Sequence, residues 1–197
     1  MVAALLFPVL LGGFSAPAVQ EDRPKLPQGP ISIRTAIILD GKKAPLIPAG
    51  KSAAVLLFVN VDCPIANRYA PDIANLRRSF AKKGVEIFHV YSDSSLTKRA
   101  IQRHQKDFSL GGTALWDKDL ALAKAVGAQA TPEAVVLDKD RRIRYRGRID
   151  SGYQPHSKER IARPVRKDLE LALTQLLAGK KIVLPSTEVV GCRLAGA

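Results

Sequence analysis

The sequence predicts an α/β sandwich built on a mixed β-sheet, and three observations carry this expectation. Residues 53–60 form a continuous apolar run, which is typical of a parallel strand buried on both faces, and an amphipathic helix comes directly after it. Residues 133–150 predict two strands joined by a tight turn, which adds an antiparallel hairpin. A last amphipathic helix over 166–178 closes the pattern. Ligands of such folds usually bind at a strand-to-helix joint, which here is the segment holding Cys63.

The elements are taken in order along the chain. A first β segment over 31–39 ends at the turn Asp40-Gly41 and is expected to form a hairpin with the residues after that turn. In residues 65–80 apolar side chains recur every three or four positions, which predicts one helix. Pro71 inside that helix should kink it, because proline lacks a backbone donor and clashes with the preceding turn. The remaining elements are a strand over 85–92, a helix over 96–108 capped by Ser94 or Ser95, and a short helix over 117–126 ended by Gly127.

Length and composition indicate one domain with tails. The chain has 197 residues, 46% of them hydrophobic, which is enough for one core. Residues 1–18 fit the apolar region of a cleaved secretory signal and end in Ala-Pro-Ala, a small-residue cleavage site, but they lack the usual positive charge at the start. An N-terminal anchor is the competing interpretation. We expect a Pro-rich linker over 19–30, a folded domain over 31–184, and a C-terminal tail over 185–197 that holds Cys192. The mature protein is therefore expected to be secreted or periplasmic, with no membrane span.

The charge is strongly positive, at +13, with 31 Lys and Arg against 18 Asp and Glu. No nucleic-acid-binding motif accompanies the charge and only 6% of residues are aromatic, so nucleic acid is not an expected partner. Arginine alternates with other residues over 142–148 and makes one face of a predicted strand entirely basic. We expect a solvated edge that blocks strand-to-strand aggregation, with an anionic docking surface as the alternative.

Cys63 lies at the first turn of the predicted helix over 65–80. Unpaired backbone donors and the positive end of the helix dipole favour a thiolate there and lower its pKa. Pro64 suits the first helical position, where its missing donor costs nothing. Asp62 opposes a second negative charge, and Arg68 one turn later offsets it. The alternative is a buried and inert cysteine.

Residues 58–93 and 113–150 resemble the redoxin branch of the thioredoxin superfamily, the alkyl hydroperoxide reductase and thiol-specific antioxidant group. The resemblance covers about residues 31–184 and implies a thioredoxin-like three-layer sandwich with a mixed central β-sheet. Thioredoxins have a Cys-x-x-Cys site with a proline eight residues after the first cysteine. Cys63 and Pro71 keep that spacing, while Ala66 stands at the second cysteine. Thr131-Pro132 matches the cis-proline of the family, which lies beside the active cysteine and lets the backbone of Thr131 pair with an extended substrate.

Two departures from the family pattern bear on the chemistry. Peroxiredoxins carry threonine three residues before the peroxidatic cysteine, and this chain has Asn60 there, so peroxide reduction and disulfide exchange both stay open. Without a local dithiol, Cys63 needs a resolving thiol from elsewhere, and Cys192 is the only other cysteine. The apolar residues of the tail predict that it packs on the domain and brings Cys192 to the Cys63 helix. A static bridge and a bridge between chains are the alternatives.

The sequence therefore predicts an exported thiol-based oxidoreductase with Cys63 as nucleophile and Cys192 as the possible resolving thiol. Its expected partners are a protein disulfide or peroxide substrate and an external thiol reductant. The three histidines are scattered, and we expect neither a cofactor nor a metal. The alternative function is a non-catalytic protein that binds a metal or a client chain, or that holds a structural disulfide. The expected substrate-binding residues are Asn60, Pro64, Arg68, Thr131 and Pro132.

Overall fold

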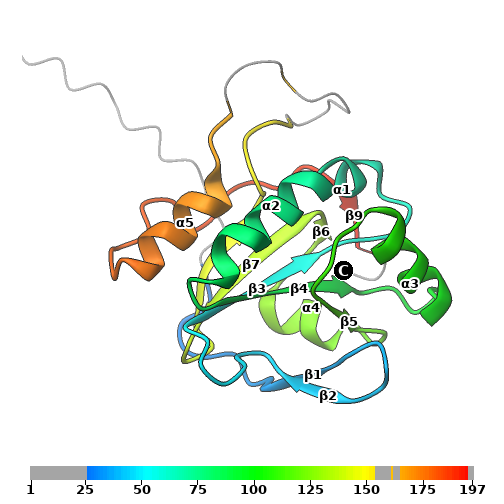
Figure 1. The fold of residues 1–197 in the computed structure, drawn as a ribbon. Helices are drawn as coiled ribbons and strands as arrows, with labels where there is room; N and C mark the ends of the chain where they lie inside the picture. The colour runs from blue at the N-terminus through cyan, green and yellow to red at the C-terminus, as the bar shows by residue number, and fades with distance from the viewer. Residues whose placement is uncertain (1–25, 154–160, 162–164, 195–197) are drawn as a thin grey trace, which may run out of the picture.

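The computed structural model describes residues 26–153, 161 and 165–194, so the predicted signal sequence over 1–18 lies outside the described part of the chain. A five-stranded sheet with the order β5-β4-β3-β7-β8 forms its centre (Figure 1). Strand β3 pairs in parallel with β4, which pairs in parallel with β5, whereas β7 is antiparallel to both β3 and β8. The predicted mixed sheet is therefore confirmed. Its strands are β3 (Ala53–Phe58), β4 (Val85–Tyr91), β5 (Thr113–Trp116), β7 (Glu133–Asp138) and β8 (Ile143–Gly147).

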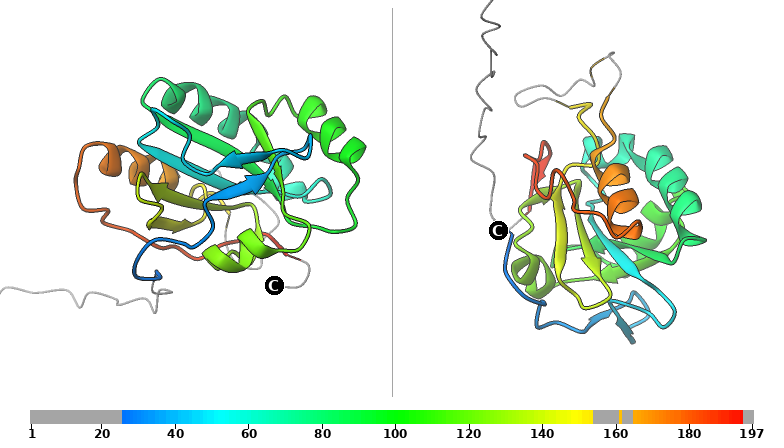
Figure 2. Two further views of the ribbon diagram at one scale, coloured as in Figure 1. Left: turned by 90° about the horizontal axis from the view of Figure 1, so that it is seen from below. Right: turned by 90° about the vertical axis from the view of Figure 1, so that its left-hand side faces the viewer.

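Helices cover both faces of this sheet, as Figures 1 and 2 show. One apolar cluster contains side chains of α2, α3 and α5, and a second cluster on the other face contains side chains of α4. All six residues of β3 are buried, because this strand lies in the middle of the sheet with a layer on each side. The three-layer sandwich is confirmed. The helices are α1 (Pro64–Arg68), α2 (Ala70–Ala81), α3 (Lys98–Asp107), α4 (Ala121–Val126) and α5 (Asp168–Leu177).

Two small antiparallel pairs flank the central sheet. The first is the predicted N-terminal hairpin, which is shorter than its apolar pattern indicated: β1 (Thr35–Ile37) pairs with β2 (Lys43–Pro45). The second joins β6 (Ala130–Thr131) to β9 (Cys192–Arg193), two segments far apart in the sequence. This second pair brings the C-terminal tail to the strand that precedes Pro132.

The helix predicted over 65–80 is two helices, α1 and α2, separated by the single residue Tyr69. Pro71 is the second residue of α2, where a backbone N–H has no intrahelical partner and its absence costs nothing. In one continuous helix its ring would clash with the carbonyl group of Asn67, four residues earlier. The kink that Pro71 predicted is therefore a break at Tyr69, between α1 and α2.

The N-cap predicted for α3 is wrong. Thr97 caps this helix, and its side chain accepts the backbone N–H of Ala100 at 3.1 Å. Ser95 is engaged in a turn instead, since its backbone N–H and its hydroxyl donate to Asp93 at 2.8 and 2.6 Å. The short helix α4 also begins later than predicted, and Asp117 accepts the backbone N–H of Leu122 at 2.9 Å from outside the helix.

The arginines over 142–148 form the predicted solvated edge only in part, since Arg142 is exposed and the Arg144 side chain is 41% exposed. The side chains of Arg146 and Arg148 are only 14% and 22% exposed. The tail covers this edge, because Arg146 donates its backbone N–H to Pro185 at 3.0 Å and accepts one from Thr187 at 3.1 Å. The tail therefore pairs with part of the strand edge that the sequence predicted to be open. The ion pairs are Arg144 with Asp138 (3.3 Å), Arg146 with Glu133 (3.7 Å) and Arg148 with Asp168 (2.7 Å).

The tail after α5 runs back across the molecule to β6 (Figures 1 and 2). Its hydroxyl anchor is Thr187, which accepts the backbone N–H of Arg148 at 3.0 Å and contacts the Tyr145 hydroxyl at 2.9 Å. Gly147 permits this contact, because a Cβ at that position would lie 2.0 Å from the Thr187 hydroxyl oxygen. Leu194, only 3% exposed, ends the described tail in the apolar cluster on the α4 side of the sheet.

Candidate active site

Cys63 sits in the turn that joins β3 to α1. The chain leaves β3 and reverses at residues 60–63, where the backbone N–H of Cys63 donates to the carbonyl of Asn60 at 3.2 Å. Cys63 is the N-cap of α1 and Pro64 is the first helical residue, as the sequence predicted. The Cys63 side chain is buried, with 1% of the residue exposed. Cys63, the candidate nucleophile, therefore lies at the strand-to-helix joint and is covered by other segments of the chain.

The atoms over Cys63 come from the loop before β7. The Thr131-Pro132 peptide bond is cis, and the Cys63 thiol donates a hydrogen bond to the Thr131 carbonyl oxygen at 3.1 Å. Glu133 fixes this loop from inside, because one of its oxygens accepts the backbone N–H of Gln129 at 2.7 Å and of Ala130 at 3.1 Å. Its other carboxylate oxygen faces Arg146. Burial raises the pKa of Glu133, and the backbone donors and Arg146 act against that rise.

Cys192 lies beside Cys63 because β9 pairs with β6. Cys192 is the partner of Thr131 in this pair, and both cysteines are free thiols. The tail approaches Thr131 so closely that a Cβ on residue 191 would lie 2.2 Å from the Thr131 carbonyl oxygen. Glycine, which has no Cβ, avoids this clash. Beyond the cysteine, the backbone N–H of Leu194 donates to Gln129 at 2.9 Å. The side chains that the sequence named as nucleophile and possible resolving thiol thus lie together.

The surroundings of Cys63 lower the pKa of its thiol. Burial acts to raise this pKa, because an apolar environment disfavours the charged form. Hydrogen bonds with the side chains of Cys192 and Thr131 and with the backbone of Ala66 outweigh burial, so the pKa lies below its ordinary value. When the thiol loses its proton it gives up its bond to the Thr131 carbonyl, while a donor from Cys192 remains. The site therefore favours a thiolate held next to a second thiol.

Three further residues expected to bind substrate lie in the turn before Cys63 or in α1. The Asn60 side chain donates to Asp93 at 3.1 Å and accepts the backbone N–H of Asp62 at 3.2 Å, so its amide holds the turn together. Pro64 is exposed at the first position of α1. Arg68 is exposed at the last position of the same helix. Their assignment as substrate-binding residues stays a prediction.

A buried polar chain behind Cys63 escaped the sequence analysis. The His104 ring contacts Asn67 at 2.7 Å through Nε2 and the Tyr91 hydroxyl at 2.8 Å through Nδ1. Asn67 in turn donates to the carbonyl of Val61 at 3.0 Å, in the turn that carries Cys63. Because the Asn67 oxygen can only accept, Nε2 of His104 carries the proton. Burial lowers the pKa of His104, which keeps the ring neutral in this chain of contacts. The three side chains, Asn67, Tyr91 and His104, come from α1, β4 and α3, so no local sequence pattern could indicate their contacts.

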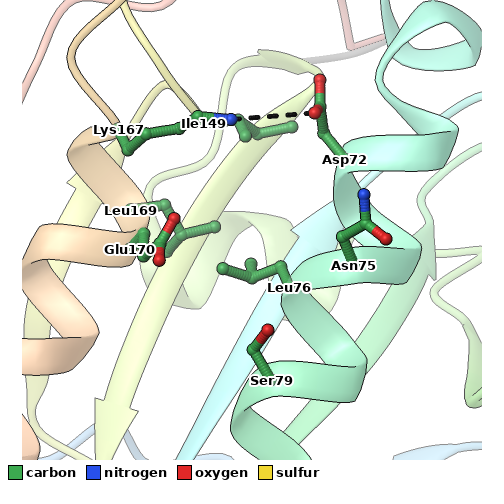
Figure 3. Close-up of a pocket in the computed structure, with 8 residues that line it drawn as sticks. All are labelled: Asp72, Asn75, Leu76, Ser79, Ile149, Lys167, Leu169 and Glu170. Carbon is green, nitrogen blue, oxygen red and sulfur yellow. Dashed lines mark ion pairs between the residues drawn. The ribbon is translucent and has the colours of Figure 1, made fainter.

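A small pocket between α2 and α5 lies apart from the cysteines (Figure 3). An ion pair between Lys167 and Asp72, 3.7 Å apart, spans it. It shares no lining residue with the site around Cys63. Its lining residues are Asp72, Asn75, Leu76, Ser79, Ile149, Lys167, Leu169 and Glu170.

The described residues hold neither a metal-binding cluster nor a membrane-spanning helix. They contain no cluster of three or more His, Cys, Asp or Glu side chains that could hold a metal ion. No helix in the same residues is long and apolar enough to cross a membrane. The candidate site around Cys63 consists of two thiols and the backbone groups next to them.

Comparisons with solved structures show which fold this is. An uncharacterised conserved protein from Geobacillus kaustophilus has a TM-score of 0.75 at 22% identity, covering 89% of this chain and 95% of that chain. A hypothetical protein from Sinorhizobium meliloti 1021 has a TM-score of 0.73 at 21% identity, covering 89% and 98%. A secreted Mycobacterium tuberculosis disulfide oxidoreductase, described as homologous to E. coli DsbE, has a TM-score of 0.52 at 18% identity, covering 74% and 94%. The predicted thioredoxin-like fold is confirmed.

The sequence itself matches one family model. A search of curated proteins finds no match. The model of the AhpC/TSA family matches residues 35–146, a segment that runs from β1 into β8 and includes Cys63 and the cis-proline. The match covers more than half of the sequence, and the chain belongs to the AhpC/TSA family.

Proposed function

We propose that this protein is an exported thiol-disulfide oxidoreductase in which Cys63 is the nucleophile and Cys192 the resolving thiol. The observation that carries the proposal is the contact between the two thiols at the cis-proline, with the pKa of Cys63 lowered by that contact. A thiolate is the attacking species in disulfide exchange, and a second thiol within reach completes the exchange without an outside partner. Membership in the AhpC/TSA family supports thiol-based redox chemistry.

The reaction starts from the dithiol form. The Cys63 thiolate attacks one sulfur of a substrate disulfide, and the other substrate sulfur leaves as a thiolate and takes up a proton. The product is a mixed disulfide on Cys63. The Cys192 thiolate then attacks the Cys63 sulfur, the second substrate sulfur leaves, and a Cys63–Cys192 disulfide remains. The substrate has gained two electrons and two protons, and an external thiol reductant restores the dithiol by the same exchange.

Disulfide exchange fits the site better than peroxide reduction. A peroxide needs a donor that holds its oxygen beside the sulfur. The side chain of Asn60, which stands where peroxiredoxins have threonine, is occupied by Asp93 and by the backbone of Asp62. Reduction of a peroxide at Cys63 would give a sulfenic acid, and attack by Cys192 would then form the same disulfide with loss of water. The two substrates are therefore distinguished by rate and by the adduct formed when Cys192 is absent.

Single cysteine variants test the proposal. Reduced protein is mixed with a peptide disulfide or with hydrogen peroxide, quenched with acid, and analysed by mass spectrometry. Wild type is expected to lose two hydrogens as its disulfide forms, and Cys63→Ser is expected to stay unchanged. Cys192→Ser should accumulate a mixed disulfide from the peptide and little sulfenic acid from peroxide. Full turnover in both variants would show that neither cysteine carries the chemistry, and faster reaction with peroxide would favour the antioxidant function.

The compartment is a separate part of the proposal. A thioredoxin-like protein described as secreted shares the fold, and residues 1–18 have the composition of a secretory signal. An exported protein meets an oxidising environment, in which a Cys63–Cys192 disulfide persists unless a reductant is supplied. The intact mass of the protein recovered from the cell exterior or periplasm tests this directly. A chain beginning near residue 19 supports export with cleavage, and a full-length chain in the cytoplasm contradicts it.

A further inference from the structure

Strand β6 offers a strand edge next to Cys63, and the chain's own tail occupies it. An unpaired edge exposes backbone donors and acceptors to any extended polypeptide, which can add to it as a further strand. Here β9 takes that place, with Cys192 opposite Thr131 and Arg193 opposite Ala130. The backbone next to the nucleophile is therefore already paired within the molecule.

Strand β9 lies where an extended substrate is expected to pair with Thr131. It is extended, it pairs with the residue before the cis-proline, and it places a cysteine sulfur against Cys63. A client segment that delivers its own disulfide to Cys63 needs the same backbone partner and the same space. With β9 in place, only 1% of Cys63 is exposed. A client chain and β9 cannot occupy this edge together.

We propose that β9 is an internal occupant of the β6 edge, and that it must leave before an extended client segment can pair with the backbone of Thr131. This inference rests on the proposed function and adds its regulation. The tail thereby serves two roles at one place: it carries the resolving thiol and it closes the site.

The attachment of the tail suits such an exchange. Thr187 is buried and bonded to the body, so the tail stays tethered when β9 leaves. The residues between Thr187 and Leu194 are exposed or half-buried, and β9 itself has two residues. Leu194 is the buried anchor at the far end. Release of β9 would therefore move residues 188–194 about their attachment at Thr187, and it requires no change in the central sheet.

The redox state sets when the site can open. In the dithiol form β9 is held by noncovalent contacts alone, so it can leave. These contacts are two backbone pairs with β6, the hydrogen bond from Leu194 to Gln129, and the packing of Val190, Cys192 and Leu194 on the apolar clusters. In the disulfide form the bond to Cys63 locks β9 onto the edge. Clients can therefore enter after an external thiol has reduced the protein, which is the form that attacks a client disulfide.

Variants in a Cys192→Ser background test the closing role, because Cys63 is then the single thiol. Gly191→Val places side-chain atoms against the Thr131 carbonyl, where even a Cβ would lie 2.2 Å away, and so displaces β9. Leu194→Ser releases the tail by a second route. Glu188→Val is the matched control, since it adds the same side chain at an exposed position. Far-UV circular dichroism and thermal melting check that each variant is folded.

Two probes separate access from reactivity. One is an unstructured peptide whose single cysteine is a mixed disulfide with thionitrobenzoate, and the other is dithionitrobenzoate itself. We expect both tail variants to raise the ratio of the peptide rate to the small-disulfide rate by about tenfold or more, because access through a minor open form grows with its population. The small disulfide corrects for any change in the reactivity of Cys63 when the donor at residue 192 moves away, and the control should match its parent in both rates. A synthetic peptide of residues 188–194 with the serine at 192 should slow the released variants again.

The outcomes distinguish this inference from the proposed function. An equal ratio of the two rates in the parent and in both tail variants, with Cys63 reactive toward the small disulfide, would overturn the closing role and leave the nucleophile intact. A lower ratio in the tail variants would show that β9 assists the client instead of competing with it, which also overturns the inference. A Cys63 that reacts with neither probe in any variant would overturn both.

Discussion

Removing the thiol of Cys192 should make Cys63 a weaker nucleophile even where Cys192 takes no part in the reaction. The Cys192 side chain is among the groups that lower the pKa of Cys63 through a hydrogen bond. A hydrogen bond to a charged group contributes about 1.5–3 kcal/mol, and each 1.4 kcal/mol is about a tenfold change in an ionisation equilibrium. Cys192→Ala leaves burial in place and deletes this donor. A thiol is a weak donor, so at neutral pH the thiolate fraction of Cys63 should fall by at most about tenfold.

Serine at the same position provides the matched control. Cys192→Ser removes the resolving thiol but keeps an O–H donor of similar size, so the pKa of Cys63 should stay low. The assay is the rate of alkylation of Cys63 by iodoacetamide as a function of pH, which reports the thiolate directly. We expect the alanine variant to need a higher pH than the serine variant for the same rate. Identical profiles for the two variants would refute the claim that the donor from Cys192 stabilises the thiolate.

Two further predictions concern stability. Burial, with His104 and Arg77 nearby, lowers the pKa of His89 to about 4, while an unfolded histidine titrates near 6.5. The unfolded state then binds the proton first, so stability should fall by up to about 3 kcal/mol as the pH drops from about 6.5 to about 4. His89→Leu should remove this loss in urea unfolding, and parallel pH profiles for variant and wild type would contradict it. Glu133→Leu should destabilise by about 3–5 kcal/mol, because it strands a buried arginine and two backbone donors. Glu86→Leu, which breaks a more exposed pair, should lose about 1 kcal/mol or less, and equal losses in the two variants would refute the argument.

The elements with strong local signals were predictable from the sequence. The apolar run of β3 and the three- and four-residue spacing in α2 and α5 depend on which residues face the core, and the structure places them as predicted. Element ends were less predictable, since they depend on competing hydrogen bonds. Ser94 or Ser95 was the expected cap of α3, but Ser95 donates to Asp93, two residues earlier, and Thr97 caps the helix instead.

The candidate site was predictable in part. Cys63 stands out because a cysteine at the end of a buried strand and the start of a helix has a defined electrostatic environment. The groups that act on it through space do not stand out. Glu133 holds β6 through backbone contacts, and His104 reaches the turn through Asn67. Neither residue lies in a motif. Glu133 bonds to the nearby backbone of Gln129 and Ala130 through a turn that its sequence does not indicate, whereas His104 meets Asn67 only when distant segments pack together.

The tail shows how a long-range contact can still leave a trace in the sequence. A backbone that must press against another backbone requires a residue without a side chain, and Gly191 is that residue at the Thr131 carbonyl. Gly147 has the same role at Thr187. Together they bring residues 187–194 against β8 and β6, which places the second cysteine beside the first. The spacing between Cys63 and Cys192 in the sequence therefore does not indicate their contact. Gly191, beside Cys192, is the local feature that the contact requires, because it lets the tail approach the backbone of Thr131.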